Sequence, residues 1–377
     1  MIAFYTWTDT QILNALNLKT GTFPQEEADL FVLELARVSQ PLLEQVRRQG
    51  VFRRIVRIPE PTDGRTGFVH VLAKLFSGPQ YHAAFRNSVD LVPGEQYRLL
   101  ITGGFWSYTV FLYRMLAKAN PQLEVAFLEE GIASYDGASI LYWCDPKSKL
   151  RSALMHLMFY PGMVGAAKRA TKTLYLYCPE ACMNRGQLTV LPMGPYTPQT
   201  LAVLQALGAH TDLDAYRTRP VIFFLQPEPD DELRRTVTWL NAAVKQFGGE
   251  NVMIKPHPDS IDRLAALPLD PAVRVDTTRV SFDNILPQVD WSGKLLITKG
   301  TSCVFYPRYI LGQEPDVVFL FKLYPHTRLK GLIERLALQL RAQYRNPQRV
   351  TVAQSDAQVL QALQNWQQRA ESWEESI

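Results

Sequence analysis

The stretch 221–255 decides the fold class. It reads VIFFLQ at 221–226, DDELRRTVTWLNAAVKQF at 230–247 and NVMIK at 251–255. The two outer segments are short apolar runs typical of buried strands, and the middle segment has the apolar spacing of a helix. A strand, a helix and a second strand in this order predict one unit of a parallel α/β sheet.

The same alternation runs along the whole chain. Apolar runs predict further strands at 2–5, 30–33, 52–58, 97–102, 124–128, 173–177, 273–276, 294–298 and 317–321. Helical patterns separate them, at 8–18, 40–49, 105–119, 302–311 and 328–345. The sequence therefore predicts an α/β protein with two doubly wound, Rossmann-like domains.

The expected linker between the domains is a proline- and glycine-containing stretch, LPMGPYTP at 191–198, followed by a short helix and RTRP at 217–220. We expect a first domain over residues 1–195, a second over 215–350, and a C-terminal helix within 351–377 that packs back on the first domain. Two domains of this kind form a cleft between the carboxyl ends of their strands, where ligands bind.

Composition excludes several classes of protein. Of the 377 residues, 47% are hydrophobic and 20% are charged, as in soluble globular proteins. No apolar run approaches the roughly 20 residues that span a bilayer, and the N-terminus lacks a signal-peptide pattern, so we expect a cytoplasmic protein. The four cysteines lack zinc-site spacing. A net charge of +4 is too small to predict nucleic-acid binding, but it suits anionic donors or an anionic membrane surface.

The first chemical motif is FLEEGIASY at 127–135. A strand runs directly into Glu129 and Glu130, and Gly131 then permits a sharp turn. A carboxylate at the end of a strand can accept a proton from a sugar hydroxyl. The alternative is an exposed turn with two solvated glutamates.

The second motif is MIKPHPD at 253–259. His257 follows a strand and stands between Pro256 and Pro258, which restrict the backbone on both sides. An imidazole presented in this way can bond a phosphate or protonate a leaving group. The alternative is a histidine in a surface loop.

The third motif is LLITKGTSC at 295–303. A strand ends at Thr298, Gly300 makes the turn, and Thr301 and Ser302 open a helix. Backbone N–H groups at a helix start, together with two hydroxyls, form a site for an anion. One of the two hydroxyls can also serve as the N-cap of the helix.

The order of these motifs resembles that of the bacterial sialyltransferases that build lipooligosaccharide and capsule. Those enzymes share an acidic pair before glycine, a His-Pro motif and a hydroxyl-rich phosphate motif on the two-domain GT-B scaffold. The start of the chain, TDTQILNALNLK at 8–19, and LEEGIASY at 128–135 resemble glycosyltransferase family 52. The resemblance covers residues 2 to 305.

The resemblance implies an inverting transfer of sialic acid from CMP-sialic acid to a terminal galactoside of a bacterial surface glycan. Glu130 would be the general base, and Glu129 would orient it or bind the acceptor. His257 would contact the phosphate and act as general acid. The donor side would comprise the residues around the second and third motifs, which are Lys255, Pro258, Gly300, Thr301 and Ser302.

The chain departs from the family pattern at two places. Glu130 stands where related enzymes often carry aspartate. The acidic residue that binds the nucleotide ribose has no clear counterpart, so Asp283 or Asn284 would take that role. Donors other than CMP-sialic acid, namely CMP-Kdo or a UDP-hexose, therefore stay open. So do an inactive protein that binds glycans or nucleotides, and a nucleotide-sugar epimerase.

Other features give weaker expectations. Gly103 and Gly104 follow a strand and could approach the acceptor with their backbone. Asp212 and Asp214 match the Asp-x-Asp pattern of metal-dependent transferases, but they do not follow a strand, so we expect no metal and no cofactor. An arginine cluster at 47–57 and an apolar segment with basic ends at 147–172 indicate peripheral contact with the inner membrane. The expected partners are the nucleotide sugar, the glycan acceptor and a second copy of the chain.

Overall fold

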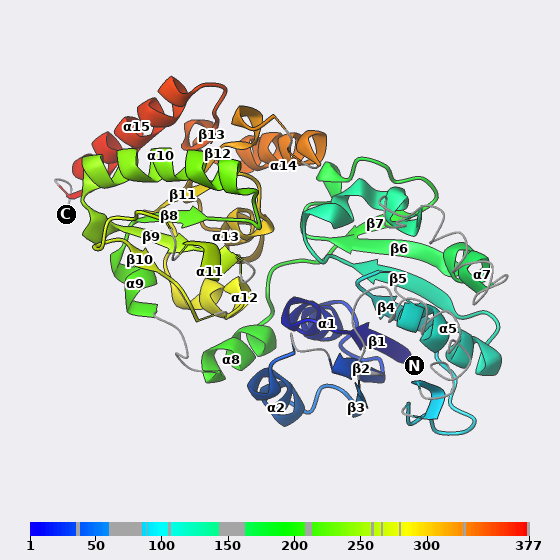
Figure 1. The fold of residues 1–377 in the computed structure, drawn as a ribbon. Helices are drawn as coiled ribbons and strands as arrows, with labels where there is room; N and C mark the ends of the chain where they lie inside the picture. The colour runs from blue at the N-terminus through cyan, green and yellow to red at the C-terminus, as the bar shows by residue number, and fades with distance from the viewer. Residues whose placement is uncertain are drawn as a thin grey trace. The chain divides into compact units, whose positions relative to one another are not determined.

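The computed structural model divides the chain into two compact units, Met1–Ala206 and Leu207–Ile377. Figure 1 shows an α/β architecture in each unit. The structure describes residues 1–34, 38–59, 85–87, 89–104, 107–142, 163–207, 213–257, 260–264, 267–278, 280–325, 327 and 329–374. Across these ranges, every helix is too short or too polar to cross a bilayer.

The first domain is built on a parallel sheet whose described strands have the order β3-β2-β1-β4-β5-β6-β7. Parallel register joins every neighbouring pair. The strands are β1 (Ile2–Thr6), β2 (Ala28–Glu34), β3 (Arg54–Pro59), β4 (Leu99–Thr102), β5 (Glu124–Leu128), β6 (Thr171–Leu176) and β7 (Thr189–Pro192). The helices named below are α1 (Asp9–Gly21), α2 (Gln40–Arg48), α5 (Ser107–Ala119), α7 (Met163–Ala170) and α8 (Pro198–Ala206), with a 3₁₀ segment, η1 (Ile132–Tyr142).

Helices cover both faces of this sheet, with α1, α2 and α8 on one side and α5 and α7 on the other (Figure 1). The central strands are therefore buried along their whole length, and β1 has no exposed position. Helix α1 starts where the Thr8 side chain accepts the Gln11 N–H, and Lys19 lies in its last turn.

The second domain repeats the plan with the described strand order β10-β9-β8-β11-β12-β13, again all parallel. The strands are β8 (Val221–Phe224), β9 (Val252–Lys255), β10 (Arg274–Val275), β11 (Leu295–Thr298), β12 (Asp316–Phe319) and β13 (Val350–Val352). The helices include α9 (Leu213–Thr218), α10 (Asp230–Phe247), α11 (Ile261–Leu264), α12 (Phe282–Ile285), α13 (Tyr306–Leu311), α14 (Lys330–Gln343) and α15 (Asp356–Glu374). Both strand orders confirm the predicted α/β class and the pair of Rossmann-like domains that characterises the GT-B fold.

The C-terminal helix packs on the second domain. Val359, Leu363 and Trp366 of α15 belong to the core of that domain, together with Trp239 of α10. Gln246 of α10 also donates to Gln367 of α15 at 2.8 Å. Helix α15 lies beside α10 (Figure 1), and its expected packing on the first domain stays a prediction.

The start of the expected linker belongs to the first domain. Residues 189–192 form β7, which pairs with β6, so the start of the proline-containing stretch lies in the first sheet. Helix α8 contacts α1 and α2 and completes the first domain. The division between the two units falls after Ala206, within the range 196–214 that separates the two expected domains.

The arginine cluster is paired with carboxylates. Arg47 and Arg48 contact Glu44, Arg57 contacts Glu34, and Arg53 and Arg54 both bind Asp29 and Glu95. These pairs account for the cluster within the fold, so it gives no support to the expected membrane contact. Most of the segment 147–172 lies outside the described residues.

Candidate functional site

Each sheet reverses its strand order at one point, between β1 and β4 in the first domain and between β8 and β11 in the second. In open α/β sheets, ligands bind beyond the carboxyl ends of the strands at such a point. The residues singled out from the sequence follow strands at or beside these points: Gly103 and Gly104 after β4, Glu129 to Gly131 after β5, His257 after β9, and Gly300 to Ser302 after β11.

Glu129 anchors the first motif. Its side chain is 1% exposed, and its Oε2 accepts the Tyr135 hydroxyl at 2.6 Å and the Tyr177 N–H at 2.9 Å. Its backbone carbonyl accepts the Asn14 side-chain N–H at 2.8 Å. Glu129 thereby connects the end of β5 to α1, η1 and the segment after β6, which is a structural role that the sequence did not predict.

Glu130, by contrast, has an exposed side chain. Its backbone N–H donates to Ser134 Oγ at 2.9 Å, and Gly131 takes a φ of 122°, a value that favours glycine. A Cβ added to Gly103 would lie 3.2 Å from Glu130 Oε2. The fixed loop therefore holds the Glu130 carboxylate over the end of β4. Gly104 accepts the Thr109 hydroxyl on its carbonyl at 2.9 Å.

Several polar groups near the reversal point of the first sheet lack partners and were not predicted. The buried atoms without a hydrogen bond include Gln11 Nε2, Tyr5 Oη, Thr6 Oγ1 and Thr102 Oγ1. Tyr5 and Thr102 are register partners on β1 and β4, so their side chains share one face of the sheet. No sequence pattern marks these residues, because each looks like an ordinary residue at the end of a strand or the start of a helix.

In the second domain, the backbone of His257 is tied to the loop after β8. Its N–H donates to Leu225 O at 3.0 Å, and its carbonyl accepts the Ser260 N–H at 2.8 Å. The Ser260 hydroxyl in turn donates to Gln226 O at 3.2 Å. These bonds fix the backbone beneath a half-buried imidazole. Pro258 lies outside the described residues.

Lys255 forms a buried ion pair rather than a free cationic site. Its Nζ lies 2.7 Å from Asp276 Oδ2 and donates to Val280 O at 2.8 Å. Burial raises the pKa of Asp276, but Lys255, Thr278 and Tyr216 together outweigh that effect and leave the pKa lowered. The ammonium is thus occupied in holding the segment 276–280 against β9.

The third motif differs in part from the predicted anion site. Thr298 Oγ1 accepts the N–H groups of Gly300 and Thr301 at 3.1 and 3.2 Å, so these two donors are already used. The Gln226 side chain donates to Gly300 O at 2.5 Å. The predicted helix 302–311 is a 3₁₀ turn, Ser302–Val304, followed by the short α13. The Thr301 hydroxyl donates to Cys303 Sγ at 3.5 Å. The hydroxyls of Thr301 and Ser302 stay the proposed ligands.

The two candidates for the ribose ligand lie on α12. Asp283 is 5% exposed, and its Oδ2 accepts the Ser281 hydroxyl at 2.7 Å. Asn284 is half-buried, and its Oδ1 is a buried oxygen without a hydrogen bond. The hydrogen bonds therefore do not decide between the two side chains as the ribose ligand.

A buried charge cluster joins Lys299 of the third motif to two glutamates that follow β8 and lie outside the three motifs. Lys299 Nζ donates to Glu232 Oε2 and lies 4.6 Å from the centre of the Tyr324 ring. Glu228 is 3% exposed and accepts the Thr236 hydroxyl at 3.1 Å. Burial raises the pKa of Glu228 to about 7, because Lys299 and Thr236 offset the desolvation only in part.

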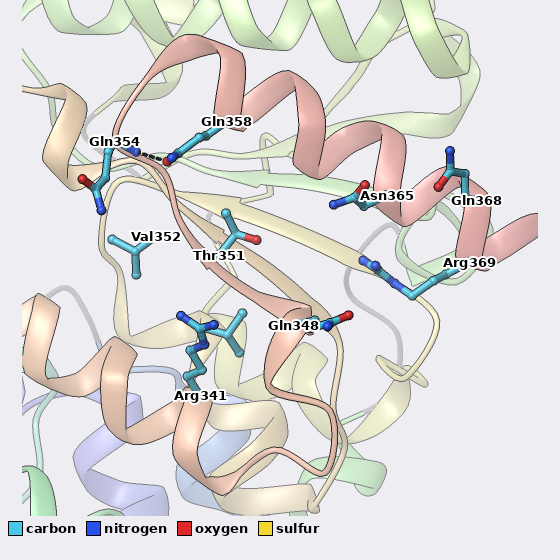
Figure 2. Close-up of a pocket in the computed structure, with 10 residues that line it drawn as sticks. Arg341, Gln348, Thr351, Val352, Gln354, Gln358, Asn365, Gln368 and Arg369 are labelled. Carbon is cyan, nitrogen blue, oxygen red and sulfur yellow. Dashed lines mark hydrogen bonds between the residues drawn. The ribbon is translucent and has the colours of Figure 1, made fainter.

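A surface pocket of about 750 Å³ lies elsewhere in the second domain, along the sheet edge at β13 between α14 and α15 (Figure 2). Its lining is polar, with Arg341, Arg369 and several glutamines. None of the residues singled out from the sequence lines it. Among the described residues, no group of three or more His, Cys, Asp or Glu side chains could hold a metal ion.

No family model matches the chain, and no curated protein does. The chain is similar to several solved structures. One is the spinosyn rhamnosyltransferase SpnG, with 13% identity, coverage of 99% of this chain and 92% of that chain, and a TM-score of 0.45. The glycosyltransferase SnogD from Streptomyces nogalater has 13% identity, coverage of 98% of this chain and 95% of that chain, and a TM-score of 0.47. A putative UDP-N-acetylglucosamine 2-epimerase from Listeria monocytogenes has 13% identity, coverage of 100% of this chain and 97% of that chain, and a TM-score of 0.44. At these values the likeness says nothing about donor or acceptor. None of the three names a sialyltransferase, so the resemblance to glycosyltransferase family 52 stays an expectation.

Proposed function

We propose that the protein is a glycosyltransferase that uses a nucleotide-activated sugar. The observation that carries this proposal is the division of roles between Glu129 and Glu130. One carboxylate is buried and fully engaged, and its neighbour is exposed on the loop that the first one fixes. An anchored acid at the carboxyl end of a Rossmann strand suits a general base.

In the proposed reaction, Glu130 takes the proton of an acceptor hydroxyl. The hydroxyl oxygen forms a bond to the anomeric carbon of the donor sugar, and the bond from that carbon to the nucleotide phosphate breaks. His257 donates a hydrogen bond or a proton to the departing phosphate, which Thr301 and Ser302 also contact. A single displacement of this kind inverts the anomeric configuration.

We further propose CMP-sialic acid as the donor and a terminal galactoside of a bacterial surface glycan as the acceptor. The order of the three motifs supports this choice, and Asp283 or Asn284 of α12 is the proposed ribose ligand. The reaction as proposed requires no metal. UDP-hexose and CMP-Kdo are the competing donors.

The test compares Glu130→Gln with the wild type and with Glu124→Gln, an exposed carboxylate at the opposite end of the same strand. We expect Glu130→Gln to lower transfer of labelled sugar by a factor of about 10² to 10⁴, the usual contribution of a general base. Nucleotide binding and melting temperature should stay at wild-type values, and Glu124→Gln should transfer normally. Normal transfer by Glu130→Gln would remove the base assignment. Product formation without any acceptor would indicate an epimerase.

A further inference from the structure

We infer that Gln11 is a positioning residue for the Glu130 carboxylate. Gln11 lies in the first turn of α1 and is fully buried. Its Oε1 accepts the Trp7 N–H at 2.9 Å, while its Nε2 is a buried donor without a partner. Buried donors are rarely left unpaired in folded proteins, so this group calls for an explanation.

The orientation of the Gln11 amide follows from its partner. A backbone N–H can donate only to the oxygen of the amide, so the Trp7 N–H fixes Oε1 toward the β1–α1 turn. Nε2 must then point the other way. The Gln11 backbone is also held, because its N–H donates to the Thr8 hydroxyl at 3.3 Å. The two hydrogen bonds therefore fix the direction of the Gln11 Nε2 donor.

The donor is aimed at the site of Glu130. A Cβ added to Gly103 would lie 2.2 Å from Gln11 Nε2 and 3.2 Å from Glu130 Oε2. Both atoms therefore lie close to one point above Gly103. A side chain at position 103 would occupy that point, so glycine there permits their approach.

The start of helix α1 does not explain why residue 11 carries an amide rather than a carboxylate. Thr8 and Gln11 have the spacing of a capping box, in which glutamate serves as well as glutamine. Glutamate would also interact favourably with the positive end of the helix dipole. It would, however, bring a second carboxylate beside Glu130. Glutamine keeps the capping oxygen and replaces that charge with an N–H donor.

Hydrogen bonds of catalytic groups are often long or poorly aligned before the substrate binds, and they tighten in the complex. On this basis, the nearby amide N–H already favours the charged form of Glu130 in the free protein. When the acceptor is bound, Gln11 Nε2 donates to one oxygen of the Glu130 carboxylate, and the other oxygen receives the acceptor proton.

The pairing can be tested without substrate, by ¹³C NMR titration of the Glu130 carboxyl in the full chain, assigned with Glu130→Gln. Gln11→Met keeps the volume but removes the donor, and Gln11→Glu adds a like charge. We expect the pKa of Glu130 to rise in both variants, and by about one unit or more in Gln11→Glu. An unchanged titration of Glu130 in both variants would overturn the inference. If Gln11→Glu does not fold, Gln11→Met alone decides.

The catalytic consequence rests on the proposed function. For transfer by Gln11→Met we expect kcat to fall about 10- to 100-fold with little change in KM, and the acidic limb of the pH–rate profile to move with the titration of Glu130. Asn17→Asp is the matched control, since Asn17 is a buried amide of the same helix whose partners are Met193, Gly194 and Thr197. It should lower the melting temperature and leave the titration of Glu130 unchanged. A shifted titration in a protein that transfers no sugar would refute the proposed function but not the pairing.

Discussion

Glu129 and Glu130 carry the same side chain in adjacent positions, yet the fold gives them opposite environments. Burial and two hydrogen bonds make Glu129 an anchor, whereas Glu130 remains exposed on the anchored loop. The family resemblance implied that Glu130 would be the general base and that Glu129 would orient it or bind the acceptor. The partners of Glu129 are Tyr135 and the segment after β6, so only the tertiary structure shows how Glu129 is held.

At the same scale, the Lys255–Asp276 pair predicts a stability effect. Lys255→Met leaves the buried Asp276 carboxylate without its cation, which typically costs about 3 to 5 kcal/mol. Urea unfolding should show this loss. Adding Asp276→Asn should recover part of it, because the unpaired charge is then gone. If Lys255→Met has normal stability but does not bind nucleotide, the result would instead support Lys255 as a ligand of the donor.

Glu228 predicts a pH effect on stability. Its pKa in the folded protein is about 7 against an ordinary value of 4.5, so between these pH values the folded state keeps a proton that the unfolded state has lost. The free energy of unfolding should therefore fall as pH rises through this window, by on the order of 3 kcal/mol. Glu228→Gln should flatten this slope in denaturant titrations at several pH values. Asp230→Asn, at an exposed acid in the first turn of α10, should leave it unchanged.

At the scale of elements, strands and helices with strong apolar patterns were predicted closely. Both β5 and α10 have the predicted bounds, because an apolar run or a long amphipathic pattern defines each of them. The short strands β7 and β13 were missed, since they consist of four and three residues at sheet edges and lack a continuous apolar run. The turn after β11 was predicted in place but not in its hydrogen bonds, which depend on Thr298.

Replacing either of two glycines near the contact between β11 and α14 by alanine should change the stability of the protein, in opposite directions. A Cβ at Gly300 would lie 2.6 Å from Ile333 Cδ1, so Gly300→Ala should destabilise the protein by about 1 to 3 kcal/mol. A Cβ at Gly331 on α14 would meet nothing within 4 Å, so Gly331→Ala should stabilise it by up to about 1 kcal/mol. Thermal unfolding compares the two. Equal effects of both substitutions would contradict this packing.

At the scale of the whole molecule, the alternation of strands and helices sufficed to predict two Rossmann-like domains. It left residues 196–214 between the two expected domains, and the first domain ends within this range, at Ala206, because α8 packs on α1 and α2. The candidate base lies in the first domain, and the candidate donor ligands lie in the second. The account therefore predicts that donor binding and proton abstraction can be lost separately.

The most direct test of the central claim is a thermal-shift panel on the full chain with CMP, CMP-sialic acid, CMP-Kdo, UDP and GDP. A ligand at 100 times its Kd stabilises the folded state by about 2.7 kcal/mol, which gives a clear rise in melting temperature. The account predicts a rise with the CMP ligands that is equal in wild type and Glu130→Gln and is reduced in His257→Ala. A rise with UDP or GDP alone would contradict the proposed donor, and no rise with any nucleotide would contradict the glycosyltransferase itself.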